Sequence, residues 1–187
     1  MMKKYILLAC CLASAIFVFP HMCSNKVSSP TVKLTLVKNR GGIANLDSPR
    51  NIEFGKTYDV AEIYIPYSGD SLNIPGVGMM GFKDDFFVDY TTKMFVPKSE
   101  VYVFKISSDD GFRLKIDGEV VMEHPENRPC TESKGEIFLE KGEHVVELNY
   151  YQGYGQLCLT ATYEKQKGGR TTTMGKHAGG VRFKLPK

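Results

Sequence analysis

The feature that most limits the fold of this chain is a series of short runs rich in β-branched and aromatic residues, separated by turn residues. Runs of about 4–8 residues with this composition are typical of β-strands. They cover residues 86–96, 101–107, 112–116, 120–122, 136–139, 144–151 and 157–163. No helical periodicity lies between them, so the sequence predicts an all-β sandwich or barrel instead of a parallel sheet with crossover helices.

Two of the turns are well specified. Apolar residues alternate with cationic residues over 112–116, which places the apolar side chains on one face of a strand. Asp117-Gly118 follows, and these residue types accept the positive φ angles of a type I′ turn. We therefore predict a hairpin that returns into Val120, and a second hairpin around residues 140–143.

The amino-terminal half has weaker patterns. Residues 32–37 alternate and predict one strand within an N-terminal extension over residues 24–42. The expected segments after it are irregular chain to about residue 55, a strand over 60–65 and a loop over 68–81. We place one domain at residues 43–164, a comfortable length for a single core.

The first residues indicate export. Lys3 and Lys4 precede an apolar run over residues 5–19, a pattern typical of a secretory signal. The run is shorter than the roughly 20 apolar residues of a permanent membrane helix. We predict a signal peptide or membrane-targeting segment over residues 1–23, and a periplasmic, extracellular or cell-surface location. Release after the small residues 13–15 and lipid attachment at Cys23 are alternatives, so membrane attachment is expected only through this end.

Charge is distributed unevenly along the chain. Residues 165–187 carry seven Lys or Arg residues and no acids, whereas residues 25–164 carry 15 basic and 21 acidic residues, a net charge of −6. The acidic body argues against a nucleic-acid partner, because phosphate binding needs clustered cations. We expect the basic C-terminal tail over residues 165–187 to be a solvated, partly disordered end.

Five cysteines occur, and two of them, Cys10 and Cys11, fall within the signal. Cys130 and Cys158 are left in the body of the chain. We predict a disulfide between them in an oxidising compartment, with two separate thiols as the alternative. No Cys-x-x-Cys pair indicates zinc or a redox dithiol.

The segment Ser107-Ser108-Asp109-Asp110-Gly111-Phe112 lies between two predicted strands. Asp and Gly are common turn residues, so in isolation this segment is interpreted as a polar turn. Adjacent carboxylates also repel each other, and a hard cation with oxygen ligands relieves that repulsion. Residues 109 and 110 are therefore also candidates for a metal site.

A longer stretch favours the metal site over a plain turn. Residues 103–118 run Val-Phe-Lys-Ile-Ser-Ser-Asp-Asp-Gly-Phe-Arg-Leu-Lys-Ile-Asp-Gly, and this string resembles the protective-antigen fourteen-kilodalton (PA14) domain family. The similarity continues through Leu-Glu-Lys-Gly-Glu-His at 139–144 and Gln-Gly-Tyr-Gly-Gln-Leu at 152–157. The match is good over about residues 84–163 and weak over residues 43–83. The resemblance implies an antiparallel β-sandwich with binding loops at one end.

The resemblance to the lectin-like branch of that family also implies a site. In such members the Asp-Asp peptide bond is cis and both carboxylates hold a calcium ion. The matching positions are Asp109 and Asp110, with the Gln152 side chain and the carbonyls of Gly153 and Gly155 as further calcium ligands, and Asn149 as an alternative amide. The sugar-binding set comprises Asp109, Asp110, Tyr154 and Gln156.

One departure stands out. Members often carry Arg-Trp-Thr-Gly on the strand before the Asp-Asp hairpin, whereas residues 89–92 here are Asp-Tyr-Thr-Thr and the chain has no Trp. This departure weakens the case for a conventional core or an aromatic sugar platform.

The function predicted from these patterns is a calcium-dependent carbohydrate-binding module for adhesion or glycan recognition, with a glycan or cell-surface polysaccharide as partner. The alternative is a secreted structural or protein-interaction module in which the Asp-Asp turn binds no sugar. An enzyme is not expected, because no acid pair or nucleophile motif is specified by spacing. The oligomeric state has no signal in the sequence.

Overall fold

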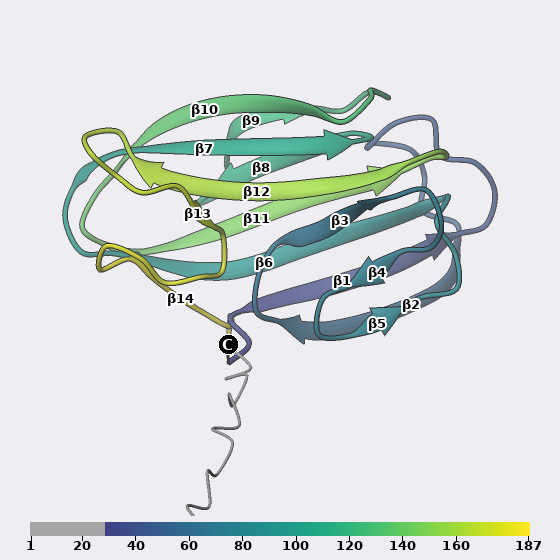
Figure 1. Ribbon diagram of the computed structural model, residues 1–187, viewed down its shortest axis with the longest axis horizontal. Coiled ribbons are helices and arrows are strands. Elements are labelled where there is room, and N and C mark those ends of the chain that lie inside the picture. Colours follow the sequence, from purple (N-terminus) through teal and green to yellow (C-terminus); the bar gives the residue numbers. More distant parts are fainter. Residues whose placement is uncertain (1–28) are drawn as a thin grey trace, which may run out of the picture.

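A computed structural model describes residues 29–187, which form two antiparallel sheets packed face to face (Figure 1). No α-helix occurs within residues 29–187, so the predicted all-β sandwich is confirmed. Within the same residues, no helix has the length and apolar character needed to cross a membrane. The predicted signal over residues 1–23 lies outside the described part of the chain.

The first sheet has the strand order β2-β1-β6-β11-β8-β9, and β14 also pairs with β6. Its strands are β1 (Val32–Asn39), β2 (Ile52–Val60), β6 (Phe86–Val96), β8 (Phe112–Ile116), β9 (Glu119–His124), β11 (Gly142–Gln152) and β14 (Arg182–Lys184).

The second sheet has the order β10-β7-β12-β13, and β3 also pairs with β12. Its strands are β3 (Tyr64–Ser68), β7 (Glu100–Asp109), β10 (Thr131–Leu139), β12 (Leu157–Lys165) and β13 (Thr172–Thr173). A separate two-stranded ribbon consists of β4 (Asn73–Ile74) and β5 (Gly78–Met79).

The core lies between the two sheets and follows the alternation of the strands. In β8, β6 and β7 every second side chain is buried, because successive side chains of a strand point to opposite faces. Large side chains such as Tyr90, Tyr150 and Phe104 are fully buried there. Without any Trp, aromatic bulk in this core comes from Tyr and Phe.

The predicted hairpin at Asp117-Gly118 is present. Asp117 has φ 51° and Gly118 has φ 86°, the two positive angles that a type I′ turn requires. The turn joins β8 to β9, with Ile116 opposite Glu119.

The prediction for the amino-terminal half was wrong in its boundaries. The strand β1 does not belong to an extension, since it lies between β2 and β6 and buries Leu34 and Leu36 completely. The strand expected over 60–65 is split between the end of β2 and the start of β3, and the expected loop over 68–81 contains the β4–β5 ribbon. Strand β2 was not predicted because Gly55 lies inside it, and Gly is depleted in strands.

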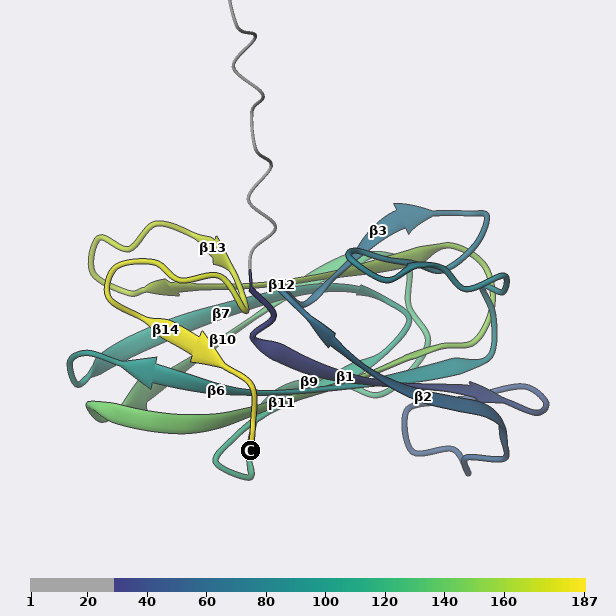
Figure 2. The same cartoon turned by 90° about the horizontal axis from the view of Figure 1, so that it is seen from below.

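The C-terminal tail was also predicted incorrectly. Residues 165–187 are ordered: β13 joins the second sheet, β14 joins the first sheet, and together they close the end of the sandwich where β12 finishes (Figure 2). Met174, Val181 and Phe183 from this segment are at most 3% exposed and belong to the core. Three of the seven cations that suggested a solvated end instead pair with acids of the body, in the contacts Lys165–Glu100, Lys176–Glu62 and Lys184–Glu143.

Cys130 and Cys158 form a disulfide, with their Cα atoms 5.8 Å apart and 28 residues apart in sequence. A link that closes a loop of this length restricts the unfolded chain and contributes about 3–4 kcal/mol to stability. We expect the Cys130→Ser/Cys158→Ser variant to lose about that free energy of unfolding in a urea titration. Dithiothreitol added to the wild type provides a second route to the same loss. A reductant-insensitive wild type would contradict the prediction.

Candidate functional site

The ends of β3, β7 and β11 and the start of β12 meet at one end of the sandwich, on the right in Figure 1. This end carries the turn at residues 109–111, the turn at residues 153–156 and the segment that joins β9 to β10. The C-terminal segment closes the opposite end.

Asp109 and Asp110 lie at this end, and the peptide bond between them is cis, as the resemblance implies. The Asp110 residue is 6% exposed. Its Oδ2 accepts a hydrogen bond from the Gly153 backbone N–H at 2.8 Å, and the Arg128 backbone N–H also donates to this carboxylate. The second acid of the pair is thus held from two sides by backbone donors.

Both carboxylates are partly removed from water, and this raises their pKa values. Burial raises the pKa of Asp109 to about 6, with the neighbouring Asp110 charge as a further cause. The Cys130 backbone N–H and the Arg128 charge act in the opposite direction. Burial also raises the pKa of Asp110, against the backbone donors of Gly153 and Arg128. The pair is therefore a desolvated anionic centre that a cation would stabilise.

An open depression lies over the acids, with a volume of about 460 Å³, within the size range of small-molecule sites. The residues that line it are Asp109, Asp110, Asn127, Arg128, Pro129, Tyr154, Gly155 and Gln156. Tyr154 is 79% exposed. The sequence-predicted sugar set, Asp109, Asp110, Tyr154 and Gln156, is therefore brought together around one cavity.

The predicted calcium ligands are only partly brought together. Gly155 lines the depression, and its N–H donates to Asp84 Oδ1 at 3.1 Å. Gln152 is fully buried, and its Oε1 contacts the Tyr150 hydroxyl at 2.8 Å, because this position faces the interior like Tyr150 two residues earlier. The Gly153 carbonyl accepts the Asp85 N–H at 2.7 Å.

The alternative amide, Asn149, points elsewhere. Its Nδ2 donates to Asp89 Oδ1 at 2.7 Å, next to the ion pair that Asp89 forms with Arg50. Within residues 29–187 no group of three or more His, Cys, Asp or Glu side chains converges as a metal cluster. Two carboxylates fit a hard cation, and the Gln152 amide is linked to this turn through the Tyr150 hydroxyl, which also donates to the Asp109 carbonyl.

Two residues of the depression, Asn127 and Arg128, were missed by the sequence analysis. Asn127 Oδ1 accepts from the Tyr151 hydroxyl at 2.5 Å. The Arg128 guanidinium donates to the hydroxyls of Ser108 (2.7 Å from Nη2) and Ser133 (2.8 Å from Nη1), and it lies over the Phe112 ring at 5.0 Å. Both side chains come from an irregular segment between two prolines, which carries no motif. The adjacent Cys130, predicted to pair with Cys158, was the one signal that tied this segment to the site.

The outer face of the first sheet supports the site. Ile43 and Leu46, from the β1–β2 loop, pack on Val37, Phe87 and Tyr151 in a small apolar cluster. The Leu46 N–H donates to the Pro125 carbonyl at 2.9 Å, so the same loop also holds the segment that carries Asn127.

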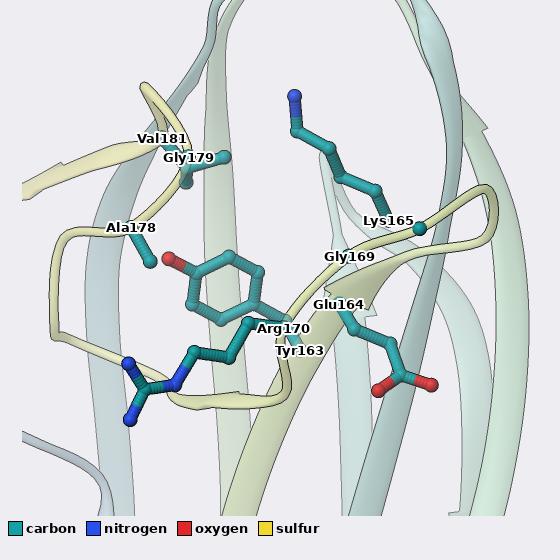
Figure 3. A pocket seen from close by; sticks show the side chains of 9 residues that line it. Tyr163, Glu164, Lys165, Gly169, Arg170, Ala178, Gly179 and Val181 are labelled. Carbon is teal, nitrogen blue, oxygen red and sulfur yellow. The ribbon is translucent and has the colours of Figure 1, made fainter.

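A different pocket, of about 240 Å³, lies at the opposite end between the end of β12 and the C-terminal segment (Figure 3). Besides Arg170, its polar side chains already have partners: Tyr163 with the Lys176 carbonyl (2.9 Å), Glu164 with Lys105 (3.0 Å) and Lys165 with Glu100 (2.9 Å). This pocket therefore offers a ligand fewer free groups than the acidic depression does.

The fold and this loop arrangement agree with a comparison against known families. A model described as the PA14 domain matches residues 77–172, about half of the chain. The chain belongs to the PA14 domain family, which confirms the resemblance inferred from residues 103–118 and the later motifs.

Particular relatives are distant. The anti-sigma-I factor RsgI3 of Acetivibrio thermocellus is 35% identical over 71 residues, which are 37% of this chain and 11% of that protein. The chain thus spans about a tenth of this curated relative. Among solved structures, the PA14 domain of the MpAFP antifreeze protein has a TM-score of 0.67 at 14% identity, over 86% of this chain and 96% of that one.

The A domain of epithelial adhesin 9 from Candida glabrata, solved in complex with Galβ1-4GlcNAc, has a TM-score of 0.64 at 10% identity, over 84% of this chain and 90% of that one. The PA14 sugar-binding domain of an RTX adhesin has a TM-score of 0.62 at 17% identity, over 78% and 96% of the two chains. At these identities the likeness shows the shared fold.

Proposed function

We propose that this chain is a non-enzymatic carbohydrate-binding module that recognises glycans at a cell surface through calcium held at Asp109 and Asp110. The observation that carries the proposal is the pair of desolvated, adjacent carboxylates at an open depression that also presents Tyr154 and Gln156. The sugar-binding domain of the RTX adhesin and the epithelial adhesin domain solved with a bound glycan support it, since they share the fold.

Calcium takes six to eight oxygen ligands, and when bound it supplies a positive centre for neighbouring sugar hydroxyls. The residues of this chain hold the two carboxylates in position. Backbone N–H groups of Gly153 and Arg128 hold Asp110, while the Arg128 charge acts on Asp109. Carboxylate oxygens that remain free accept hydrogen bonds from the sugar.

The other side chains of the depression orient the ligand. Tyr154, which is largely solvated, offers a ring face to an apolar face of a sugar. Gln156 and Asn127 carry amide groups that both donate and accept, which suits sugar hydroxyls.

One observation favours the alternative, a structural or protein-interaction module. The Arg128 guanidinium already places a positive charge near Asp109, and it is fixed by Ser108 and Ser133. An acid pair compensated in this way has less need of a metal. The similarity to an anti-sigma factor fits a module within a larger signalling protein equally well.

Calorimetric calcium titration separates these functions. We expect the wild-type chain to bind one calcium ion with a Kd of about 10⁻⁴–10⁻³ M, the range of extracellular modules. Losing a coordinating carboxylate should weaken binding by at least the roughly 10–100-fold seen for residues that only support metal ligands. The Asp109→Asn/Asp110→Asn variant is thus expected to show no binding.

Asp70→Asn serves as the control, because Asp70 is an exposed acid on the loop after β3. It should bind calcium as the wild type does. A glycan array in calcium, repeated with chelator, then reports sugar binding. A wild type that binds no calcium and no glycan would favour the structural module.

A further inference from the structure

Tyr67 is a large aromatic side chain left in solvent at the same end of the sandwich as the acids. It lies near the end of β3 and is 64% exposed. No hydrogen bond or ring contact occupies its side chain among the described residues. The proposal for this residue rests on the carbohydrate function argued above.

The register of the second sheet places Tyr67 on the face that carries Asp109. Asp109 lies opposite Cys158 on β12, whose far side pairs with β3. Ser68 lies opposite Leu157 and Ile65 lies opposite Leu159, so Pro66 and Tyr67 together oppose the single residue Cys158. A β-bulge has this two-to-one arrangement.

The direction of the side chains follows from burial. Leu157 and Leu159 are fully buried and face the core, so Cys158 between them faces outward, where it bonds to Cys130. Tyr67, opposite Cys158 and mostly exposed, belongs to this outer face.

Three neighbouring strands therefore present a row across the end of the sheet: Asp109 on β7, the disulfide on β12 and Tyr67 on β3. Adjacent strands are about 4.8 Å apart, so the backbone at Tyr67 lies about 10 Å from that at Asp109. The 153–156 turn, with Tyr154, leads directly into the start of β12 between them. The two exposed tyrosines thus lie along one continuous edge with the acidic depression.

We propose that Tyr67 forms a second sugar subsite, so that the ligand class is a chain of two or more sugar units instead of a single terminal sugar. The first unit occupies the depression at Asp109, Asp110 and Tyr154. The next unit passes over the disulfide and packs against the Tyr67 ring, a rigid amphipathic surface with few torsions to restrain.

Single exposed aromatic residues are common on protein surfaces, so a matched control is needed. Phe138 provides it. This residue is 59% exposed and lies on β10 of the same sheet, opposite Val101 near the start of β7, far from the end of β7 where Asp109 lies.

The experiment compares monosaccharides with their β1-4-linked di- and trisaccharides in calcium, using glucose, galactose, mannose and N-acetylglucosamine series. For the series that binds, we expect wild-type affinity to rise about 3- to 10-fold from the monosaccharide to the longer ligand, the free energy of one aromatic contact. Tyr67→Ala should remove that rise and leave monosaccharide binding unchanged. Tyr67→Phe should keep it, and Phe138→Ala should behave as the wild type.

The outcomes distinguish this inference from the proposed function. Monosaccharide binding with no dependence on chain length, or a full dependence retained in Tyr67→Ala, overturns the second subsite alone. Absence of binding to every member of the panel removes the proposed function and the subsite with it. Thermal unfolding should be unchanged in Tyr67→Ala, because the ring is solvated.

Discussion

Replacing Phe183 with alanine is expected to cost the domain about 3–5 kcal/mol, the range for deleting a buried phenylalanine side chain. Phe183 is 3% exposed, and its ring meets that of Tyr163 edge-to-face at 5.3 Å between centroids. Its N–H donates to His177 Nδ1 at 3.0 Å, and its strand pairs it with the fully buried Met94. The neighbouring structure is fixed by two sheets, so it cannot collapse easily into the space.

Such a loss is a large part of the roughly 5–15 kcal/mol that stabilises a typical domain. Removal of residues 166–187 takes away Met174, Val181 and Phe183 together, and we expect no folded domain from that truncation. Urea unfolding followed by circular dichroism measures both changes. Lys187→Ala, an exposed cation of the same segment, is the control and should unfold as the wild type. A cooperative transition of wild-type stability in the truncated chain would show that the segment is dispensable.

The error in predicting this segment has a physical origin. Seven cations among 23 residues dominate its composition, whereas the three side chains that matter are isolated and separated by glycines and polar residues. An alternating pattern that extends over only two or three residues is too short to predict a strand from the sequence. The acids that pair with Lys165, Lys176 and Lys184 lie far away in sequence, so counting charges within the segment alone predicted a solvated end where the fold supplies partners.

The candidate site was predictable to the extent that its residues are contiguous. Asp109 and Asp110 stand in one motif, and Tyr154 and Gln156 stand in another, so both sets were found. Arg128 was not, because its position beside Asp109 depends on the disulfide and on pairing between β7 and β10.

Gln152 shows the opposite limit. The residue type of Gln152 suits a calcium ligand, but the face to which its side chain points depends on its place in the alternation of the strand. Strand β11 continues as far as Gln152, and its side chain is therefore turned inward with that of Tyr150.

Gly111→Ala is expected to damage the fold and the site together. A Cβ at this position would lie 2.6 Å from the His124 carbonyl oxygen, 2.6 Å from Tyr151 Cε1 and 3.0 Å from the Glu126 carbonyl oxygen. Two of these three atoms are backbone, so no side-chain rotation relieves the contact. Overpacking of a core usually costs about 1–3 kcal/mol, and we expect a loss at the upper end of that range.

The way in which the structure would relax around the added methyl group links the loss of stability to a loss of binding. Residue 111 follows the acid pair, and its carbonyl accepts the Tyr151 N–H at 3.1 Å. The opposing residues 124–126 lead directly into Asn127 and Arg128, which line the depression. Any shift that makes room for the methyl group therefore moves one wall of the depression relative to the other, and we expect calcium and sugar affinity to fall together with stability.

The matched control is Gly69→Ala, where an added Cβ meets no atom within 4 Å. That variant should match the wild type in urea unfolding and in calcium titration. If Gly111→Ala unfolded at the wild-type denaturant concentration and still bound calcium normally, the close packing of the acid turn against the β9–β10 segment would not be what fixes the site. If it lost binding while keeping stability, the turn would have adapted locally by displacing Asp110 from the N–H groups of Gly153 and Arg128, the contacts that hold its carboxylate in place.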